Sequence, residues 1–173
     1  MKKILAIDMD EVLADLITPW VHNINKAEND NVSANDIKTW NFGKYFKCGK
    51  RVYDYLDYEL FRNLPVKEDS QRVVRSLMDV YDIFIVSSAT NHHDSLKAKM
   101  EWLEEHFPFI PASNIVLCGN KSIIKADFMI DDGIHNLEVF GGHGILFDAP
   151  HNRDEDRYTR AMNWNDIERL LFK

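Results

Sequence analysis

The chain has few cysteines, no long apolar run and no cluster of basic residues, and each absence excludes a class of protein. Its two cysteines, Cys48 and Cys118, lie far apart in unlike contexts, so neither a disulfide framework nor a paired-cysteine metal site is predicted. No apolar run approaches membrane-spanning length, and the four apolar residues after Lys3 are too few for the core of a signal peptide. We therefore expect a cytoplasmic protein with no membrane partner.

The charge balance argues against a nucleic-acid polymer as a partner. The formal net charge is −7 at pH 7, and no segment is rich in Lys and Arg. Binding to a nucleic-acid backbone requires a clustered positive surface, which this sequence does not offer. A small phosphorylated substrate stays compatible with the charge, because one metal ion and one or two lysines can offset a phosphate locally.

Short apolar runs alternate with helical patterns along most of the 173 residues. The predicted strands cover residues 4–7, 83–86, 115–117, 128–130 and 145–147. The predicted helices cover residues 15–28, 50–61, 68–78, 94–106, 136–140 and 164–172. This alternation is typical of a Rossmann-like α/β fold, in which helices flank a parallel sheet. The sequence indicates no oligomeric state.

Residues 17–65 interrupt the alternation after the first strand and are rich in aromatic side chains. We expect them to form a small helical cap over an α/β core made of residues 1–16 and 66–173. Aromatic side chains in such a segment belong more often to its own core than to a substrate pocket. Two interpretations of Trp40, Phe42 and Phe61 stay open: they belong to the core of the cap, or they line a substrate pocket.

Chemically reactive side chains follow three of the predicted strands. The first strand ends in two aspartates, the second in two serines and the fourth in two aspartates, with a lysine in the loop before the fourth: Asp8, Asp10, Ser87, Ser88, Asp131, Asp132 and Lys121. Ligands of parallel sheets bind beyond the carboxyl ends of the strands. Each aspartate pair alone could merely cap a helix, but together the four segments bring reactive groups to one edge.

These motifs resemble those of the haloacid-dehalogenase superfamily of phosphotransferases. ILAIDMDEVLAD resembles the first motif, IFIVSS the second, Lys121 in NKSIIKAD the third and FMIDD the fourth. The resemblance covers nearly the whole chain and implies a sheet order of 5-4-1-2-3. Within the superfamily, DMDEVLAD and IVLCGNKSIIKADFMIDD resemble the 5'(3')-deoxyribonucleotidases. That family implies a magnesium-dependent phosphomonoesterase acting on (deoxy)ribonucleoside monophosphates.

The resemblance implies a role for each acid. Asp8 would attack phosphorus and form an aspartyl-phosphate, and Asp10 would protonate the leaving oxygen and then activate the hydrolytic water. Mg²⁺ prefers oxygen ligands. These ligands would come from Asp8, the main-chain carbonyl of Asp10 and Asp132. Asp131 would belong to the metal site without binding the ion directly.

Ser87, Ser88 and Lys121 would bind the phosphate oxygens. Lys125 competes for the cationic role, but Lys121 has the spacing that the resemblance implies, ten residues before the acidic pair. Leu16 stands where the family has a pocket aromatic, so we include it among the pocket candidates.

Glu11 is the main departure from the family pattern, which has glycine after the first motif. Glycine tolerates a positive φ that a tight turn can require, so Glu11 either adopts a strained backbone or marks a different turn. Two alternatives to a nucleotidase stay open: a phosphatase of a sugar phosphate or another small metabolite, and a non-catalytic aspartyl-phosphate switch.

Overall fold

The computed structural model describes residues 1–90 and 92–172. Its described residues form one parallel sheet in the order β3-β2-β1-β4-β5-β6. The strands are β1 Lys3–Ile7, β2 Tyr81–Ser88, β3 Ile115–Cys118, β4 Phe128–Asp131, β5 His143–Phe147 and β6 Thr159–Ala161. The predicted α/β fold is confirmed, and the five predicted strands lie in the predicted order. The edge strand β6 was not predicted, because its three residues contain no apolar run.

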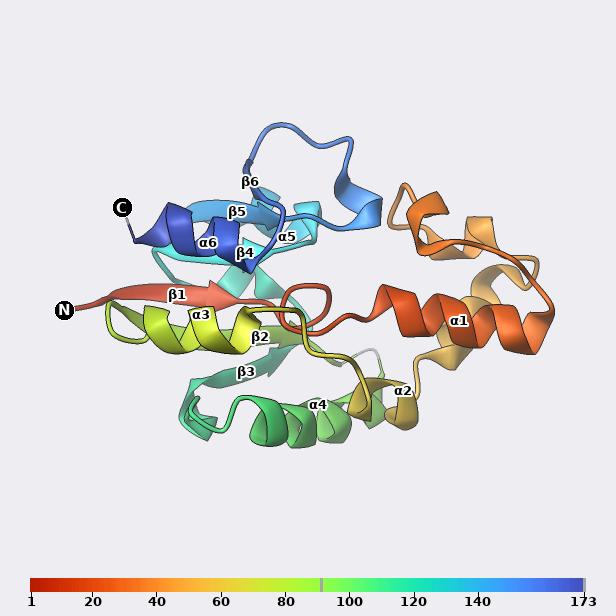
Figure 1. Cartoon of the computed structure of the whole chain (residues 1–173), viewed down its shortest axis with the longest axis horizontal. Coiled ribbons are helices and arrows are strands. Elements are labelled where there is room, and N and C mark those ends of the chain that lie inside the picture. Colours follow the sequence, from red (N-terminus) through yellow and green to blue (C-terminus); the bar gives the residue numbers. More distant parts are fainter. Residues whose placement is uncertain (91, 173) are drawn as a thin grey trace.

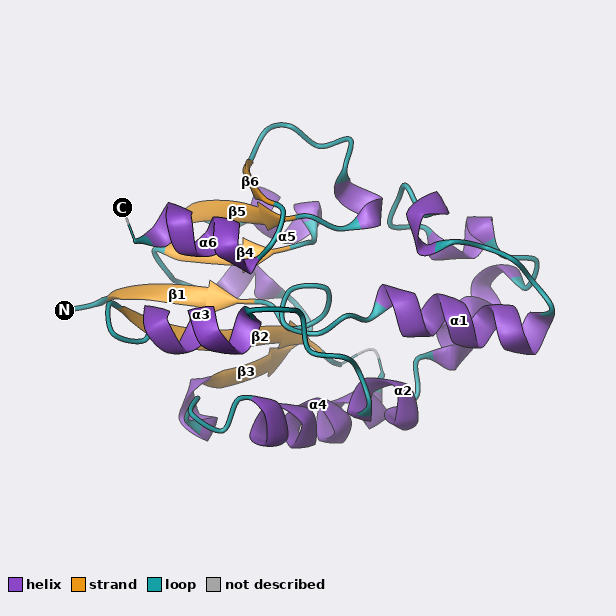
Figure 2. Ribbon diagram, viewed as in Figure 1, coloured by secondary structure: helices purple, strands orange, loops and turns teal. Residues whose placement is uncertain are grey.

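Helices cover both faces of the sheet (Figure 2). They are α1 Ile17–Glu28, α2 Tyr58–Arg62, α3 Ser70–Leu77, α4 His93–His106, α5 Ile134–Glu138 and α6 Trp164–Leu171. Because side chains alternate along a strand, Leu5 and Ile7 of β1 join one core with α3, α4 and α6. Ala6 faces the other way and joins a smaller core with Leu137 of α5. Strand β1 is therefore buried on both faces and pairs with β2 and β4.

The predicted helix over residues 50–61 is wrong as a single element. A 3₁₀ helix covers Gly49–Tyr55, and α2 begins only at Tyr58. Asp57 has an extended backbone, and its carboxylate accepts a hydrogen bond from the Leu60 N–H at 2.8 Å. Because Asp57 caps a new helix with an extended backbone, the 3₁₀ helix before it cannot continue into α2.

Residues 17–65, called the cap segment here, extend beyond the carboxyl ends of the strands (Figure 1). Its longest element, α1, buries the predicted apolar stripe, which includes Trp20 and Ile24. The Trp20 indole N–H donates to the Val52 carbonyl at 2.9 Å, and its ring lies 4.7 Å from that of Phe42. The predicted division into a core and a cap with these boundaries stays a prediction.

The two chain crossings between the sheet and the cap segment run side by side. The Asp15 N–H donates to the Pro65 carbonyl, and the Lys67 N–H donates to the Leu13 carbonyl, both at 2.8 Å. Ala14 and Val66 form the bridge between them. This short two-stranded connection sets where the cap segment leaves and rejoins the sheet.

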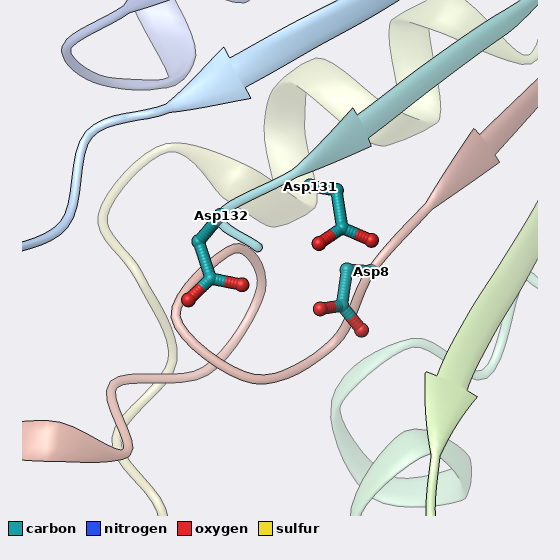
Figure 3. Close-up of side chains that lie close together, drawn as sticks. All are labelled: Asp8, Asp131 and Asp132. Carbon is teal, nitrogen blue, oxygen red and sulfur yellow. The ribbon is translucent and has the colours of Figure 1, made fainter. Parts of the chain in front are cut away.

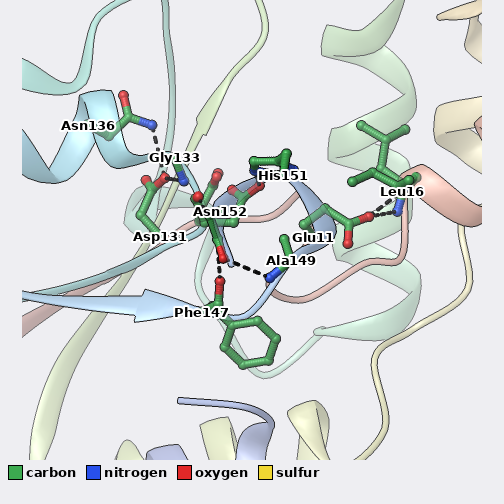
Figure 4. A network of polar contacts seen from close by, with 12 residues as sticks. Glu11, Leu16, Asp131, Gly133, Asn136, Phe147, Ala149, His151 and Asn152 are labelled. Atoms are coloured by element: carbon green, nitrogen blue, oxygen red, sulfur yellow. Dashed lines mark hydrogen bonds and ion pairs between the residues drawn. The ribbon is translucent and has the colours of Figure 1, made fainter. Parts of the chain in front are cut away.

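Glu11 fixes this connection. Its φ is +58°, and its side chain is buried. Oε1 accepts hydrogen bonds from the N–H groups of Leu16 and Ile17 at 2.8 and 2.6 Å, while Oε2 lies 3.0 Å from Lys67 Nζ (Figure 4 shows Glu11 and Leu16). Helix α1 has no side-chain cap at Leu16, so Glu11 satisfies its first free N–H groups. Glu11 therefore has a strained backbone, and its side chain joins the two crossings.

Replacing Glu11 with alanine is expected to lower the free energy of unfolding by about 2–3 kcal/mol, because two buried N–H groups and Lys67 lose their partner. Glu11→Gly should be about 0.5–1 kcal/mol more stable than Glu11→Ala, since glycine accepts the positive φ. Urea unfolding measures both differences. The exposed Glu104→Ala on α4 is the control, and an alanine variant at position 11 as stable as the parent would contradict the account.

Candidate active site

Three buried carboxylates gather where two neighbouring strands end (Figure 3). Asp8 follows β1 directly, Asp131 ends β4, and Asp132 comes next in the chain. Each offers one oxygen, and these oxygens all lie within 4.8 Å of one another. The sequence places them together because β1 and β4 are adjacent and parallel, so their carboxyl ends meet.

Lys121 lies between two of these acids. Its Nζ is 2.7 Å from Asp8 Oδ1 and 2.7 Å from Asp131 Oδ2, and its side chain is buried. Burial alone would lower the pKa of Lys121, but the two carboxylates outweigh burial and raise it. Lys125, the competing candidate, is exposed. The structure thus brings Lys121, and not Lys125, to the acids.

The pKa of Asp8 lies well above its usual range. Burial is the main cause and outweighs the nearby Lys121; three neighbouring carboxylates add to it, those of Asp131, Asp132 and Asp10. A site of this kind carries more negative charge than its lysines offset, which is the condition that a bound cation relieves.

The two acids after β4 have different surroundings. Both oxygens of Asp131 are taken by protein donors: Oδ2 by Lys121, and Oδ1 by the Gly133 N–H and the Asn136 amide at 2.8 and 2.9 Å (Figure 4). Among residues 1–90 and 92–172, the one side chain that lies at such a distance from the Asp132 carboxylate is His151, whose Nε2 is 3.0 Å from Oδ2. The Asp132 carboxylate is therefore freer than that of Asp131 to bind a metal ion.

His151 lies beside Asp132, and sequence reasoning missed it as a site residue. It lies in a 3₁₀ turn, Pro150–Asn152, in which the Asn152 amide donates to the carbonyls of Asp132 and Phe147 at 2.9 and 2.8 Å. Burial would lower the pKa of His151, but the Asp132 carboxylate outweighs burial and raises it. The signal in the sequence was the position of His151 just after the fifth strand, at the same edge as the acids.

Asp10 contacts a lysine that sequence reasoning missed. Lys99 of α4 is buried, and its Nζ lies 2.7 Å from Asp10 Oδ2, 3.0 Å from Ser87 Oγ and 2.7 Å from the Ser88 carbonyl oxygen. Lys99 occupies an apolar position of its helix, beside the buried Ala98 and one turn before Trp102. A charged residue on the apolar stripe of a helix was the signal that could have identified it.

A cavity of about 590 Å³ opens over these groups between the sheet and the cap segment. The predicted site residues that line it are Asp8, Asp10, Leu16, Trp40, Phe42, Ser88 and Asp132. Ser87 and Lys121 are buried behind this surface. The expectation for Phe61 is corrected: it is buried in the core, with its ring 5.0 Å from Lys99 Nζ, because α2 packs against α4.

The aromatic side of the cavity includes His135 of α5 and His151 of the 3₁₀ turn Pro150–Asn152. The Trp40 ring is half exposed and lies 4.8 Å from His135 and 4.6 Å from His151, both edge-on. Trp20 and Tyr53 line the cavity further into the cap segment. The acidic end and the aromatic end together suit a ligand that carries both a charged group and a flat ring.

The family model described as 5' nucleotidase, deoxy (pyrimidine), cytosolic type C protein matches residues 2–173. The chain belongs to this family. A 5'(3')-deoxyribonucleotidase of Bacillus subtilis (strain 168) is 61% identical over 171 residues, covering 99% of each chain. One from Clostridium acetobutylicum is 40% identical over 172 residues, covering 98% of this chain and 94% of the relative. The predicted resemblance to the 5'(3')-deoxyribonucleotidases is confirmed.

Solved structures share the fold at low identity. A haloacid dehalogenase-like hydrolase from Streptococcus pneumoniae aligns with a TM-score of 0.66 at 10% identity, covering 99% of each chain. A haloacid-dehalogenase-type hydrolase of Bacillus subtilis, described as bound to magnesium, aligns with a TM-score of 0.58 at 12% identity, covering 98% of each. These likenesses show the superfamily's fold. Within the part of the chain that the structure describes, no helix has the length and apolarity to cross a membrane.

Proposed function

We propose that this protein is a 5'(3')-deoxyribonucleotidase that hydrolyses the phosphate monoester of deoxyribonucleoside monophosphates. The observation that carries the proposal is the convergence of Asp8 and Asp10 at one cavity that also has an aromatic end, with Lys121 in contact with Asp8. The relative of 61% identity bears that activity in its name. A cytosolic location agrees with the name of the family and with two free cysteines.

Asp8 is the nucleophile in this proposal, and its two oxygens have different roles. Oδ1 accepts from the Met9 N–H and lies against Lys121, each at 2.7 Å. We assign Oδ2 to the attack. A bond forms between Oδ2 and phosphorus as the bond from phosphorus to the nucleoside oxygen breaks, and Asp10 gives that oxygen a proton. Water then attacks phosphorus and gives a proton to Asp10, the bond between Oδ2 and phosphorus breaks, and phosphate leaves with the Asp8 carboxylate restored.

The phosphate oxygens need donors on the side away from the nucleoside. Ser88 lines the cavity and Lys121 stands behind Asp8, so both can hold a transferring phosphoryl group. Ser87 lies deeper, and its Oγ accepts a hydrogen bond from Lys99 Nζ at 3.0 Å, so we propose that it supports Ser88 more than it donates directly to phosphate. Its direct role in phosphate binding stays a prediction.

The acids at this edge fit a divalent cation. They are hard oxygen donors, they lie within 4.8 Å of one another, and their mutual repulsion adds to burial in raising the pKa of Asp8. We propose Mg²⁺, held by Asp8, Asp132 and the main-chain carbonyl of Asp10, with Asp131 orienting Lys121 and the loop at Gly133. When bound, the ion would neutralise charge on the phosphate.

The aromatic end of the cavity is the proposed site of the nucleobase. Trp40 and Phe42 offer ring faces or edges, and Leu16 adds apolar surface where relatives are expected to have an aromatic. Stacking of a base on an aromatic side chain is worth about 1–3 kcal/mol. A deoxyribonucleoside monophosphate would reach from this end to Asp8 and Asp10.

Asp8→Asn is expected to lower phosphate release from a deoxyribonucleoside monophosphate at least about 10⁴-fold, because the amide cannot attack phosphorus. Malachite-green detection of phosphate measures the loss, and circular dichroism checks the fold. The exposed Asp79→Asn should keep parent activity. Turnover of the Asp8 variant within about tenfold of the parent would refute the nucleophile assignment.

MgCl₂ at about 100 times its dissociation constant is expected to stabilise the parent by about 2.7 kcal/mol. The corresponding rise in melting temperature is roughly 5–10 °C. Asp132→Asn should lose most of this rise because a carboxylate ligand is gone, while the exposed Asp54→Asn keeps it. Differential scanning fluorimetry with and without EDTA provides the comparison. An undiminished rise in the Asp132 variant would exclude Asp132 as a ligand.

Trp40→Ala is expected to raise KM for a deoxyribonucleoside monophosphate about tenfold more than KM for p-nitrophenyl phosphate, since only the nucleotide carries a base to stack. Trp40→Phe keeps a ring and should stay close to the parent. Steady-state kinetics on both substrates decide the point. Equal losses on both would favour a sugar phosphate or another small metabolite as the substrate.

A further inference from the structure

All hydrogen-bond donors of Lys99 are directed at protein groups. An ammonium group has three N–H donors and no acceptor. Three oxygens lie within hydrogen-bond distance of Lys99 Nζ, those of Asp10 Oδ2, Ser87 Oγ and the Ser88 carbonyl. No donor of Lys99 is left for a substrate, so this lysine acts on the site only through the groups it binds.

The two oxygens of Asp10 are therefore unlike. Oδ2 accepts a charge-assisted hydrogen bond from Lys99, whereas Oδ1 is buried and has no hydrogen-bond partner in residues 1–90 and 92–172. A buried carboxylate oxygen without a partner is costly. Asp10 lines the cavity beside Asp8 with a side chain that is 23% exposed, so the contact from Lys99 to Oδ2 sets how its carboxylate faces the cavity.

Lys99 is held in place from the cap side as well. The Phe61 ring lies 5.0 Å from Nζ, a cation–π distance, and the Trp102 indole N–H on the next turn donates to the Leu64 carbonyl at 2.8 Å. An ion pair between Arg62 and Glu105 joins the same two helices, α2 and α4. The ammonium group is thus fixed between the end of the cap segment and Asp10.

We propose that Lys99 is a positioning residue for the phosphatase reaction, which holds Asp10 through Oδ2 in the orientation from which its carboxyl group protonates the leaving oxygen. This inference rests on the proposed function. In the step, the carboxyl hydrogen of Asp10 passes to the nucleoside oxygen, which takes the electron pair of its breaking bond to phosphorus, while Asp8 forms the new bond. Lys99 keeps its three hydrogens throughout.

Lys99→Met removes the donors and keeps an apolar stem of similar length. Its kcat on a deoxyribonucleoside monophosphate should fall about 100-fold with little change in KM, because proton delivery to a poor leaving group is impaired. On p-nitrophenyl phosphate, whose leaving oxygen needs little protonation, kcat should fall less than about tenfold. Lys97→Met, on the exposed face of the same helix, is the control and should behave as the parent.

A double-mutant cycle separates positioning from a structural role. If Lys99 acts through Asp10, adding Lys99→Met to Asp10→Asn should cost less than about threefold more. Lys99→Gln keeps an N–H donor, so its kcat should fall less than that of Lys99→Met. It replaces Lys99→Met in the cycle if the methionine variant does not fold. Losses that multiply in the double variant, or that are equal on the two substrates, would overturn the proposal.

A crystal structure of the Lys99→Met or Lys99→Gln variant tests the inference without activity. We expect the Asp10 carboxylate to rotate in the methionine variant and to keep its place in the glutamine variant; an unmoved carboxylate in the methionine variant would overturn the proposal. If the parent releases no phosphate from any monophosphate, the proposed function fails on its own. If Asp8→Asn abolishes turnover while Lys99→Met does not alter it, only the present inference fails.

Discussion

A surplus of buried negative charge at one edge of the sheet is the constraint on which the rest of the site depends. Adjacent parallel strands β1 and β4 end together, which puts Asp8 and Asp131 side by side with Asp132. Burial and mutual repulsion raise the pKa of Asp8, and Lys121 offsets only part of the charge. A site in this condition favours a cation and an anionic phosphate held together, which is the combination a phosphomonoesterase needs.

The same kind of buried ion pair connects this edge to the cap segment. Glu11 satisfies the start of α1 and pairs with Lys67 on the returning crossing. Lys99 pairs with Asp10 on one side and contacts Phe61 on the other. Both lysines tie an acid of the loop after β1 to another segment: Lys67 belongs to the chain that returns from the cap segment, and Lys99 contacts Phe61 near the end of the cap segment. The position of the cap segment and the orientation of Asp10 are therefore set by neighbouring contacts.

Much of this arrangement can be predicted from the sequence, because it depends on patterns among residues that are close together along the chain. Apolar runs predict the five strands β1 to β5, and an acid, serine or lysine after a run predicts the reactive edge. Glu11 could be flagged because glycine is expected there, and its positive φ is what the structure contains. Membership of the deoxyribonucleotidase family also follows from these motifs, which disfavours the aspartyl-phosphate switch.

The remainder depends on tertiary packing, which pattern alone does not reveal. Strand β6 forms only because it pairs with β5, and the aromatic Phe61 enters the core because α2 packs against α4. Lys99 resembles any solvated helix lysine until its helix is docked, and His151 resembles a turn residue until Asp132 lies beside it. The residues missed are those whose role is created by a neighbour distant in sequence.

The central claim is that Asp8 carries the phosphoryl group during turnover. The most direct measurement is acid quenching of the enzyme during hydrolysis of a deoxyribonucleoside monophosphate, followed by peptide mass spectrometry. The account predicts that the peptide containing Asp8 gains the mass of one phosphoryl group, with the group located on Asp8 by fragmentation. A phosphoryl group on another residue, or none at any quench time while phosphate is released, would contradict it.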